Sequence, residues 1–344
     1  MAHANTRTTV VRIAVARFES TCATPTFANK AVAAANNADR SAHPIQVIAL
    51  WYSSRLRCWS SRLDFMETGR ASKTALGVAI RRAAHQLFDK PPVLDDPIAT
   101  RLVGDGHPRL MERAMHPVGR DFRGFMAARS RYAEDRLVEA VANGVAQYVV
   151  LGAGLDTFAY RNPFSALQVF EVDFPATQAW KRSMLEEAAI ALPSNLVFVA
   201  LDFEHHALAD GLAQGGLDPH KAAFFSWLGV VPYLTLEAFR ATLSVVAQMP
   251  AGSAISFDYA VAPQTLSPIG RIAFDRLSER VAAAGEPFQL FFTPEDLGAE
   301  IRRAGFKHIE QVDSAGLNEL YFNNRADGLK LSPLGLGMLV TAWV

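Results

Sequence analysis

The chain has 344 residues, half of them apolar, and its 34 basic and 34 acidic side chains give a formal net charge of zero. This length and apolar content are enough for one large α/β domain or two small ones. The balanced charge gives no reason to expect nucleic acid or an anionic membrane as a partner, and no stretch reaches the roughly 18 apolar residues that span a bilayer.

Both cysteines, Cys22 and Cys58, lie within the first 65 residues. Neither a disulfide framework nor a cysteine-ligated metal site is therefore expected in the rest of the chain. The histidines are not spaced as metal ligands either, so we expect no metal. A reducing compartment, the cytoplasm, is the simplest location.

Residues 1–65 differ in composition from the rest of the chain. They are rich in Ala, Ser, Thr and Arg and hold eight basic but only three acidic residues, a composition similar to that of an organellar transit peptide. We favour a disordered extension or a start assigned too far upstream, because Met66 directly precedes ETGRASKTA, which fits the folded part. We predict one domain over 66–344, with a helical cap at 66–145 and an α/β core at 146–344.

Two helices are predicted ahead of the core. Residues 73–87 and 121–141 place apolar side chains at helical spacing, and Asn143-Gly144 ends the second helix. A proline-punctuated loop, PPVLDDPIA, follows the first helix. We expect these helices to cap the ligand-binding end of the sheet.

Strand and helix patterns then alternate, which predicts an α/β domain. Thr235 caps a helix that runs to about Gln248, and Thr293-Pro294 starts another with acids in its first turn. A long insertion occupies residues 261–292. The seven predicted strands cover residues 147–152, 167–173, 196–202, 222–231, 254–261, 306–312 and 337–344.

The strongest functional signal lies after the first three strands. The first strand enters a glycine turn, Gly152-Ala153-Gly154, which allows a sharp bend and a close approach to a ligand. The second strand ends on Asp173, which can accept hydrogen bonds from both hydroxyls of a ribose. The third ends on Asp202, which can accept one from an adenine amino group. Ligands of open α/β sheets bind at these carboxyl ends.

The details of the turn favour one cofactor. A dinucleotide fingerprint requires a third glycine where this chain has Thr157, and Asn162-Pro163 interrupts the helix that would face a pyrophosphate. There is no GxxxxGK[ST] motif for a phosphate loop. A ligand with a ribose but no phosphate fits better, and S-adenosylmethionine is the common one.

The chain resembles the leucine carboxyl methyltransferase family in four segments: GAGLDTFAYR, FEVDFP, a strand ending in LDF, and FFSWLGVVPYLT. This family of class I S-adenosylmethionine-dependent methyltransferases includes polyketide O-methyltransferases, and the resemblance covers roughly Met66 to the C-terminus. It implies a Rossmann-like sheet of seven mostly parallel strands with helices on both faces. The seventh strand is then antiparallel and inserted beside the fifth.

The resemblance also implies cofactor contacts. Arg129, in AARSRYAED, matches the arginine that binds the cofactor carboxylate, with Arg131 as the fallback, and Lys73 matches a basic residue of the first helix. The alternatives are an ion pair of Arg129 on its own helix and a solvated Lys73. A family glutamate five residues before the tyrosine of VVPYLT is replaced here by Leu228. The expected cofactor-binding residues are Lys73, Arg129, Gly152, Gly154, Asp173, Asp202 and Phe203.

These observations predict an O-methyltransferase that acts on a carboxyl or hydroxyl group of a small molecule or peptide. A carboxylate acceptor needs no general base, and we assign none; the candidates are Asp258, Tyr233 and the pair His205-His206. The acceptor pocket is expected between the helices of 73–128 and the insertion, with four aromatic side chains that line it or belong to the core: Phe274, Phe288, Phe291 and Phe292. Two alternatives remain, a nicotinamide-dependent oxidoreductase and a non-catalytic relative.

Overall fold

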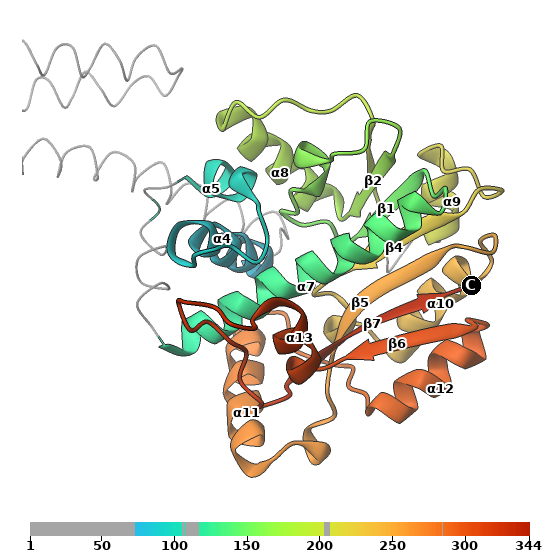
Figure 1. Cartoon of the computed structure of the whole chain (residues 1–344). Coiled ribbons are helices and arrows are strands. Elements are labelled where there is room, and N and C mark those ends of the chain that lie inside the picture. The colour runs from blue at the N-terminus through green and yellow to red at the C-terminus, as the bar shows by residue number, and fades with distance from the viewer. Residues whose placement is uncertain (1–72, 105–106, 108–116, 203–206, 284) are drawn as a thin grey trace, which may run out of the picture. The chain divides into compact units, whose positions relative to one another are not determined.

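The computed structural model describes residues 73–104, 107, 117–202, 207–283 and 285–344 (Figure 1). The chain divides into two compact units, Met1–Phe65 and Met66–Val344, and every described residue belongs to the second. The expectation for residues 1–65 therefore lies outside the described residues, and the domain boundary stays a prediction.

Seven strands form one mixed sheet in the order β3-β2-β1-β4-β5-β7-β6 (Figure 1). β7 pairs antiparallel with both β5 and β6, whereas the other pairs are parallel. The topology implied by the family resemblance is confirmed, including the place of the seventh strand. The strands are β1 Gln147–Leu151, β2 Gln168–Asp173, β3 Leu196–Ala200, β4 Ala223–Trp227, β5 Ala254–Ala260, β6 His308–Val312 and β7 Gly337–Trp343.

Two strands end at least two residues earlier than predicted. β4 ends at Trp227, because the chain bends at Gly229, which has a φ of 73° and is followed by the turn η2. β3 ends at Ala200, so Asp202 lies in the loop beyond it. Asp258 lies within β5 and pairs with Leu339 of β7.

The predicted helix signals act as expected. The Thr235 side chain accepts a hydrogen bond from the backbone N–H of Ala238, Thr293 accepts one from Asp296, and Gly305 ends its helix at a φ of 109°. The helices and 3-10 turns are α4 Lys73–Phe88, α5 Pro97–Val103, α7 Pro117–Ala142, η1 Phe158–Arg161, α8 Pro175–Glu187, α9 Leu208–Gln214, η2 Val231–Tyr233, α10 Leu236–Ala247, η3 Pro263–Thr265, α11 Pro268–Ala283, α12 Pro294–Ala304 and α13 Ser314–Tyr321.

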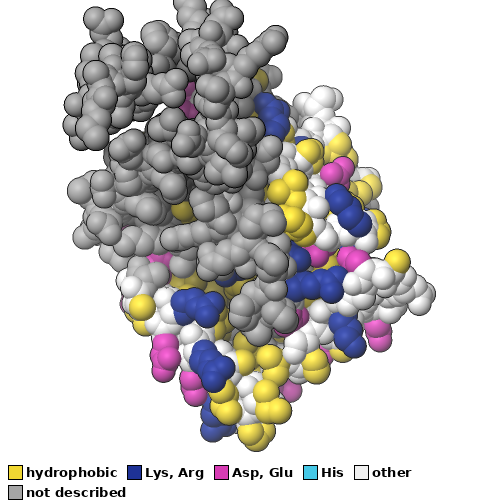
Figure 2. All heavy atoms as spheres, turned by 90° about the vertical axis from the view of Figure 1, so that its left-hand side faces the viewer, with side chains coloured by type: hydrophobic (Ala, Val, Ile, Leu, Met, Phe, Trp, Pro, Cys, Tyr) yellow, Lys and Arg dark blue, Asp and Glu magenta, His cyan; other side chains and the backbone are white. Residues whose placement is uncertain are grey.

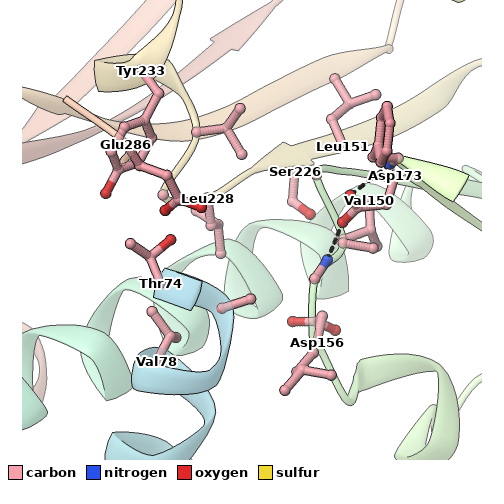
Figure 3. A pocket seen from close by; sticks show the side chains of 18 of the residues that line it. Thr74, Val78, Val150, Leu151, Asp156, Asp173, Ser226, Leu228, Tyr233 and Glu286 are labelled. Carbon is pink, nitrogen blue, oxygen red and sulfur yellow. Dashed lines mark hydrogen bonds between the residues drawn. The ribbon is translucent and has the colours of Figure 1, made fainter. Parts of the chain in front are cut away.

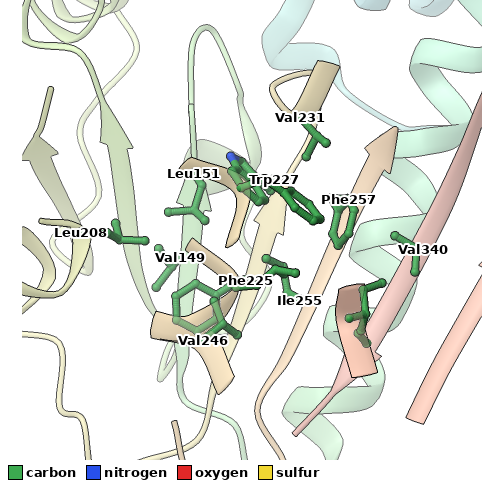
Figure 4. Packing of buried hydrophobic residues seen from close by; sticks show 14 of the residues in the cluster. Val149, Leu151, Leu208, Phe225, Trp227, Val231, Val246, Ile255, Phe257 and Val340 are labelled. Carbon is green, nitrogen blue, oxygen red and sulfur yellow. The ribbon is translucent and has the colours of Figure 1, made fainter. Parts of the chain in front are cut away.

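The central strands are buried on both faces, as expected for parallel strands with nearly continuous apolar sequence. Alternate side chains contribute to different clusters, so Phe225 packs with helices α9, α10 and α12 while Phe224 packs with α7. Trp227 stacks on Phe239 with ring centroids 5.8 Å apart. Figure 4 shows Trp227 with Val231 and Phe257 of the same cluster. Helices therefore cover both faces, and the core holds the carboxyl ends of β1, β2 and β4 in place.

A buried ion-pair network joins the N-terminal helices to the loop after β1. Arg82 of α4 donates through Nε to Asp96, 3.0 Å away, and the hydroxyl of Thr157 donates to the same carboxylate at 2.7 Å. Burial would raise the pKa of Asp96, but Arg82 and Arg161 hold it below its usual range. The hydroxyl of Thr157 is therefore not used to cap η1. The side chain of Asp156 caps this turn instead, by accepting a hydrogen bond from the N–H of Phe158.

Basic and acidic side chains are interspersed on the described part of the face in Figure 2. Among the helices that the structure describes, none has the length and hydropathy to cross a bilayer. The cytoplasmic location stays a prediction.

Candidate functional site

A cavity of about 500 Å³ lies at the carboxyl ends of β1, β2 and β4 and is bordered by α4 (Figure 3). We call it the cofactor pocket. Its lining includes five of the seven predicted contacts, from segments far apart in the sequence: Arg129, Gly152, Gly154, Asp173 and Asp202. Helix α4 begins at Lys73, but the side chain of this lysine and the whole of Phe203 lie outside the described residues.

Both glycines of the turn are required by the backbone and by their neighbours. Gly152 and Gly154 have φ values of 63° and 47°, which other residues rarely adopt. A Cβ atom on Gly152 would lie 2.4 Å from a methyl group of Val230, whereas one on Gly154 would lie 3.2 Å from the Cβ of Ala75. The turn therefore packs tightly against the segment after β4 and against α4.

Gly152→Ala is expected to destabilise the fold by more than the roughly 1–2 kcal/mol of left-handed backbone strain, because its new methyl group also meets Val230. Gly154→Ala carries the backbone strain with a milder contact, so it is the matched comparison. Urea unfolding of both variants measures the difference. Adding Val230→Ala should restore only the steric part in the Gly152 variant; no restoration would contradict this account.

Asp173 lies at the end of β2 and faces the pocket. One carboxylate oxygen accepts a hydrogen bond from the N–H of Gly154, and the other accepts one from Phe174 at 2.6 Å. Burial raises the pKa of Asp173, and these two bonds oppose the rise. Each carboxylate oxygen has a second lone pair, so the group can also accept from two ribose hydroxyls. The pocket thus fits an adenosine.

Arg129 is buried on α7 and pairs with an acid distant in sequence. Its Nη1 donates to Asp258 of β5 at 3.0 Å, and the other oxygen of Asp258 accepts from the N–H of Gly229 at 2.5 Å. The alternative for Arg129, an ion pair within its own helix, is therefore wrong. Arg131 does form such an ion pair, with Asp135 at the surface. The Nε of Arg129 is buried without an acceptor among the described residues, so Arg129 keeps a donor for a ligand carboxylate.

The guanidinium of Arg129 lies directly on the backbone of Gly229. A Cβ atom at this position would come within 2.8 Å of both terminal nitrogens, and the φ of Gly229 is 73°. The bend that ends β4 early therefore makes room for Arg129. Leu228 lines the pocket beside it, at the position where the family resemblance implies a glutamate.

A second cavity, of about 160 Å³, adjoins the cofactor pocket and shares Arg129, Gly229 and Tyr233 with it. We call it the acceptor chamber. Its walls come from α7, α11, β5 and the segment before β7, and they include the aromatic residues Phe122, Phe125, Tyr259, Phe274 and Phe288.

Two of the four predicted phenylalanines, Phe274 and Phe288, line this cavity. Phe291 packs against Phe274 with centroids 5.5 Å apart, and Phe292 packs against Phe239 in the core. Neither of these two is among the residues that line the chamber.

Among the base candidates, Asp258 and Tyr233 border the chamber, and His205-His206 lies outside the described residues. Asp258 is already engaged by Arg129 and Gly229. Burial raises the pKa of Tyr233 to about 12, so this phenol stays protonated at neutral pH. The described residues contain no cluster of metal-ligating side chains.

Glu286 was missed by sequence reasoning. It lines the cofactor pocket from the segment between α11 and α12 (Figure 3). The residues around it, AAGEPFQ, carry a turn signal but no motif that would assign it to the pocket.

Comparison with known proteins places the chain in a family. The sequence model of the leucine carboxyl methyltransferase family matches residues 75–247. YktD of Bacillus subtilis strain 168, provisionally named an S-adenosyl-L-methionine-dependent methyltransferase, is 32% identical over 291 residues, which cover 77% of this chain and 95% of YktD. A similarly named protein of Mycolicibacterium paratuberculosis is 30% identical over 63% of this chain and 43% of its own length. A solved DUF574 family structure from Streptomyces avermitilis covers 80% of this chain and 98% of its own, with 14% identity and a TM-score of 0.48.

The mixed sheet, the glycine turn and the acid that ends β2 define a class I methyltransferase that depends on S-adenosylmethionine. The chain belongs to the leucine carboxyl methyltransferase family. The family and cofactor predicted from the sequence are thereby confirmed, and the nicotinamide-dependent alternative is wrong.

Proposed function

We propose that this enzyme methylates an oxygen atom of a small, largely apolar acceptor bound in the acceptor chamber. The observation that supports this most is the position of the chamber, which shares Arg129, Gly229 and Tyr233 with the cofactor pocket. An acceptor in the chamber would face the cofactor across these residues. Tight positioning of this kind supplies most of the rate of a displacement reaction.

We also propose how the pocket holds the cofactor. Asp173 accepts from the ribose hydroxyls, Asp202 accepts from the adenine amino group, and Arg129 donates to the carboxylate of the amino-acid end. The bound cofactor supplies a methyl group on a positively charged sulfur. The backbone turn at Gly152 and Gly154 brings the chain close to it, because no side chain stands between.

The chamber favours a hydroxyl acceptor over a carboxylate. Its described lining contains Asp121, Asp258 and a single cation, Arg129, which is already paired with Asp258. A carboxylate acceptor would enter this apolar space without a free cation, which is costly. A hydroxyl group enters uncharged and needs no counter-cation in this space.

Leu277→Trp is expected to lower methyl transfer by at least about tenfold, because the larger side chain fills the chamber and displaces the acceptor. Transfer is measured with S-adenosylmethionine and a panel of small aromatic alcohols, phenols and carboxylic acids. The affinity for S-adenosylhomocysteine should not change. Ile272→Trp, on the same helix but 55% exposed, is the matched control and should retain both properties.

Three results would contradict this proposal. Equal activity in the Leu277 and Ile272 variants would show that the acceptor binds elsewhere. Transfer to carboxylic acids alone would exclude the hydroxyl preference. Cofactor binding without turnover on any acceptor would favour the non-catalytic alternative.

A further inference from the structure

One carboxylate of the cofactor pocket has no assigned partner. Glu286 lies at the same end of the pocket as Thr74, Leu228 and Tyr233, and Asp173 lies at the opposite end (Figure 3). No described residue donates a hydrogen bond or forms an ion pair with the Glu286 carboxylate. A half-buried acid without a partner at the edge of a ligand cavity is available for a cation.

The segment that carries Glu286 is attached on both sides of this residue. The backbone N–H of Glu286 donates to Val281 of α11 at 3.1 Å. Gln289 is held against η2, since its backbone N–H donates to Pro232 at 2.7 Å and its side chain donates to Tyr233 at 2.9 Å. The carboxylate is therefore held at the pocket by its neighbours.

Opposite charges meet at this end of the pocket. Glu286 raises the pKa of Tyr233 and Arg129 lowers it, so both charges lie within electrostatic reach of this phenol. Arg129 in turn lies on Gly229, next to Leu228. Asp258 also lies here but is already paired with Arg129. Arg129 and Glu286 together complement a group that carries both a carboxylate and an ammonium, which is the charge pattern of an α-amino acid.

We propose that Glu286 binds the α-ammonium of the cofactor's amino-acid end, while Arg129 binds its carboxylate. This inference rests on the cofactor placement proposed above. It also accounts for Leu228, because the carboxylate expected at that position would be supplied by the segment between α11 and α12.

The test compares two ligands by calorimetry. S-Adenosylhomocysteine has the amino-acid end, whereas 5′-methylthioadenosine keeps the adenosine and the sulfur but lacks that end. Glu286→Gln should weaken the first ligand about tenfold, as expected for one charged hydrogen bond at a partly exposed site, and leave the second unchanged. Glu279→Gln, an exposed acid of α11, is the matched control and should change neither affinity.

A second variant tests the geometry directly. Leu228→Glu combined with Glu286→Gln should recover most of the lost affinity for S-adenosylhomocysteine, because it places a carboxylate at the same end of the pocket. Equal weakening of both ligands by Glu286→Gln, or no weakening of either, would overturn the role of Glu286. If the unmodified protein bound neither ligand, the cofactor placement itself would fail.

Discussion

Lys181→Met is expected to lower the free energy of unfolding, by about 1–3 kcal/mol near pH 8. Lys181 of α8 donates to Glu171 of β2 at 2.5 Å, and both side chains are 1% exposed. The ammonium also lies 5.3 Å from the centre of the Tyr160 ring. Removing the lysine leaves Glu171 buried without a counter-charge, so this side chain must take up a proton in the folded state, at a cost that grows as the pH rises.

The loss of stability should depend on pH in a defined direction. Burial raises the pKa of Glu171 to about 7, despite the opposing effect of Lys181. Between the ordinary glutamate range and pH 7, the folded state holds a proton on Glu171 that the unfolded state has released. The contribution of Glu171 to the free energy of unfolding therefore falls as the pH rises through this range. Without Lys181 the folded pKa rises further. The difference between variant and unmodified protein should therefore be small near pH 5 and larger near pH 8.

A double variant separates charge from packing. Glu171→Leu combined with Lys181→Met replaces the pair by apolar groups, and it should recover most of the lost stability. Guanidinium unfolding from about pH 5 to pH 8 measures all three proteins. A loss for Lys181→Met that is independent of pH would show that the buried charge is not its cause.

Asp173→Ala is expected to weaken the binding of S-adenosylhomocysteine by about 10- to 100-fold, the equivalent of one or two hydrogen bonds to a charged group. The substitution also removes the acceptor for the N–H groups of Gly154 and Phe174, so the glycine turn loses its support. Calorimetry measures the affinity, and thermal unfolding checks that the variant is folded.

A ligand lacking one hydroxyl shows whether Asp173 acts on the ribose. The 2′-deoxy analogue should bind the unmodified protein more weakly than S-adenosylhomocysteine does, but the Ala variant should bind both ligands equally. A remaining preference for the hydroxyl in the Ala variant would place the ribose contact on another residue.

Much of the fold could be predicted from local patterns. The apolar runs of β1 and β4 are buried on both faces, and the hydroxyl caps Thr235 and Thr293 bind the N–H groups that their positions imply. These features depend on residues within one turn or one strand of each other, so the sequence shows them directly.

Contacts between distant segments could not be predicted. The sequence did not show that Arg129 pairs with Asp258, 129 positions later, or that Thr157 donates to Asp96, 61 positions earlier. No periodicity or motif records such pairs, because the choice among acceptors depends on which elements the fold brings together. Glu286 was missed for the same reason.

The sequence by itself determined the class of fold through its glycine turn and its apolar strand runs, which local geometry requires. It indicated the cofactor and the family through the acids that follow two strands and through the resemblance of four segments to known methyltransferases. Only the tertiary structure decided which charges meet. It placed Asp258 on Arg129, Lys181 on Glu171 and Glu286 at the cofactor pocket, since the energy of a buried charge depends on its neighbours in space rather than along the chain.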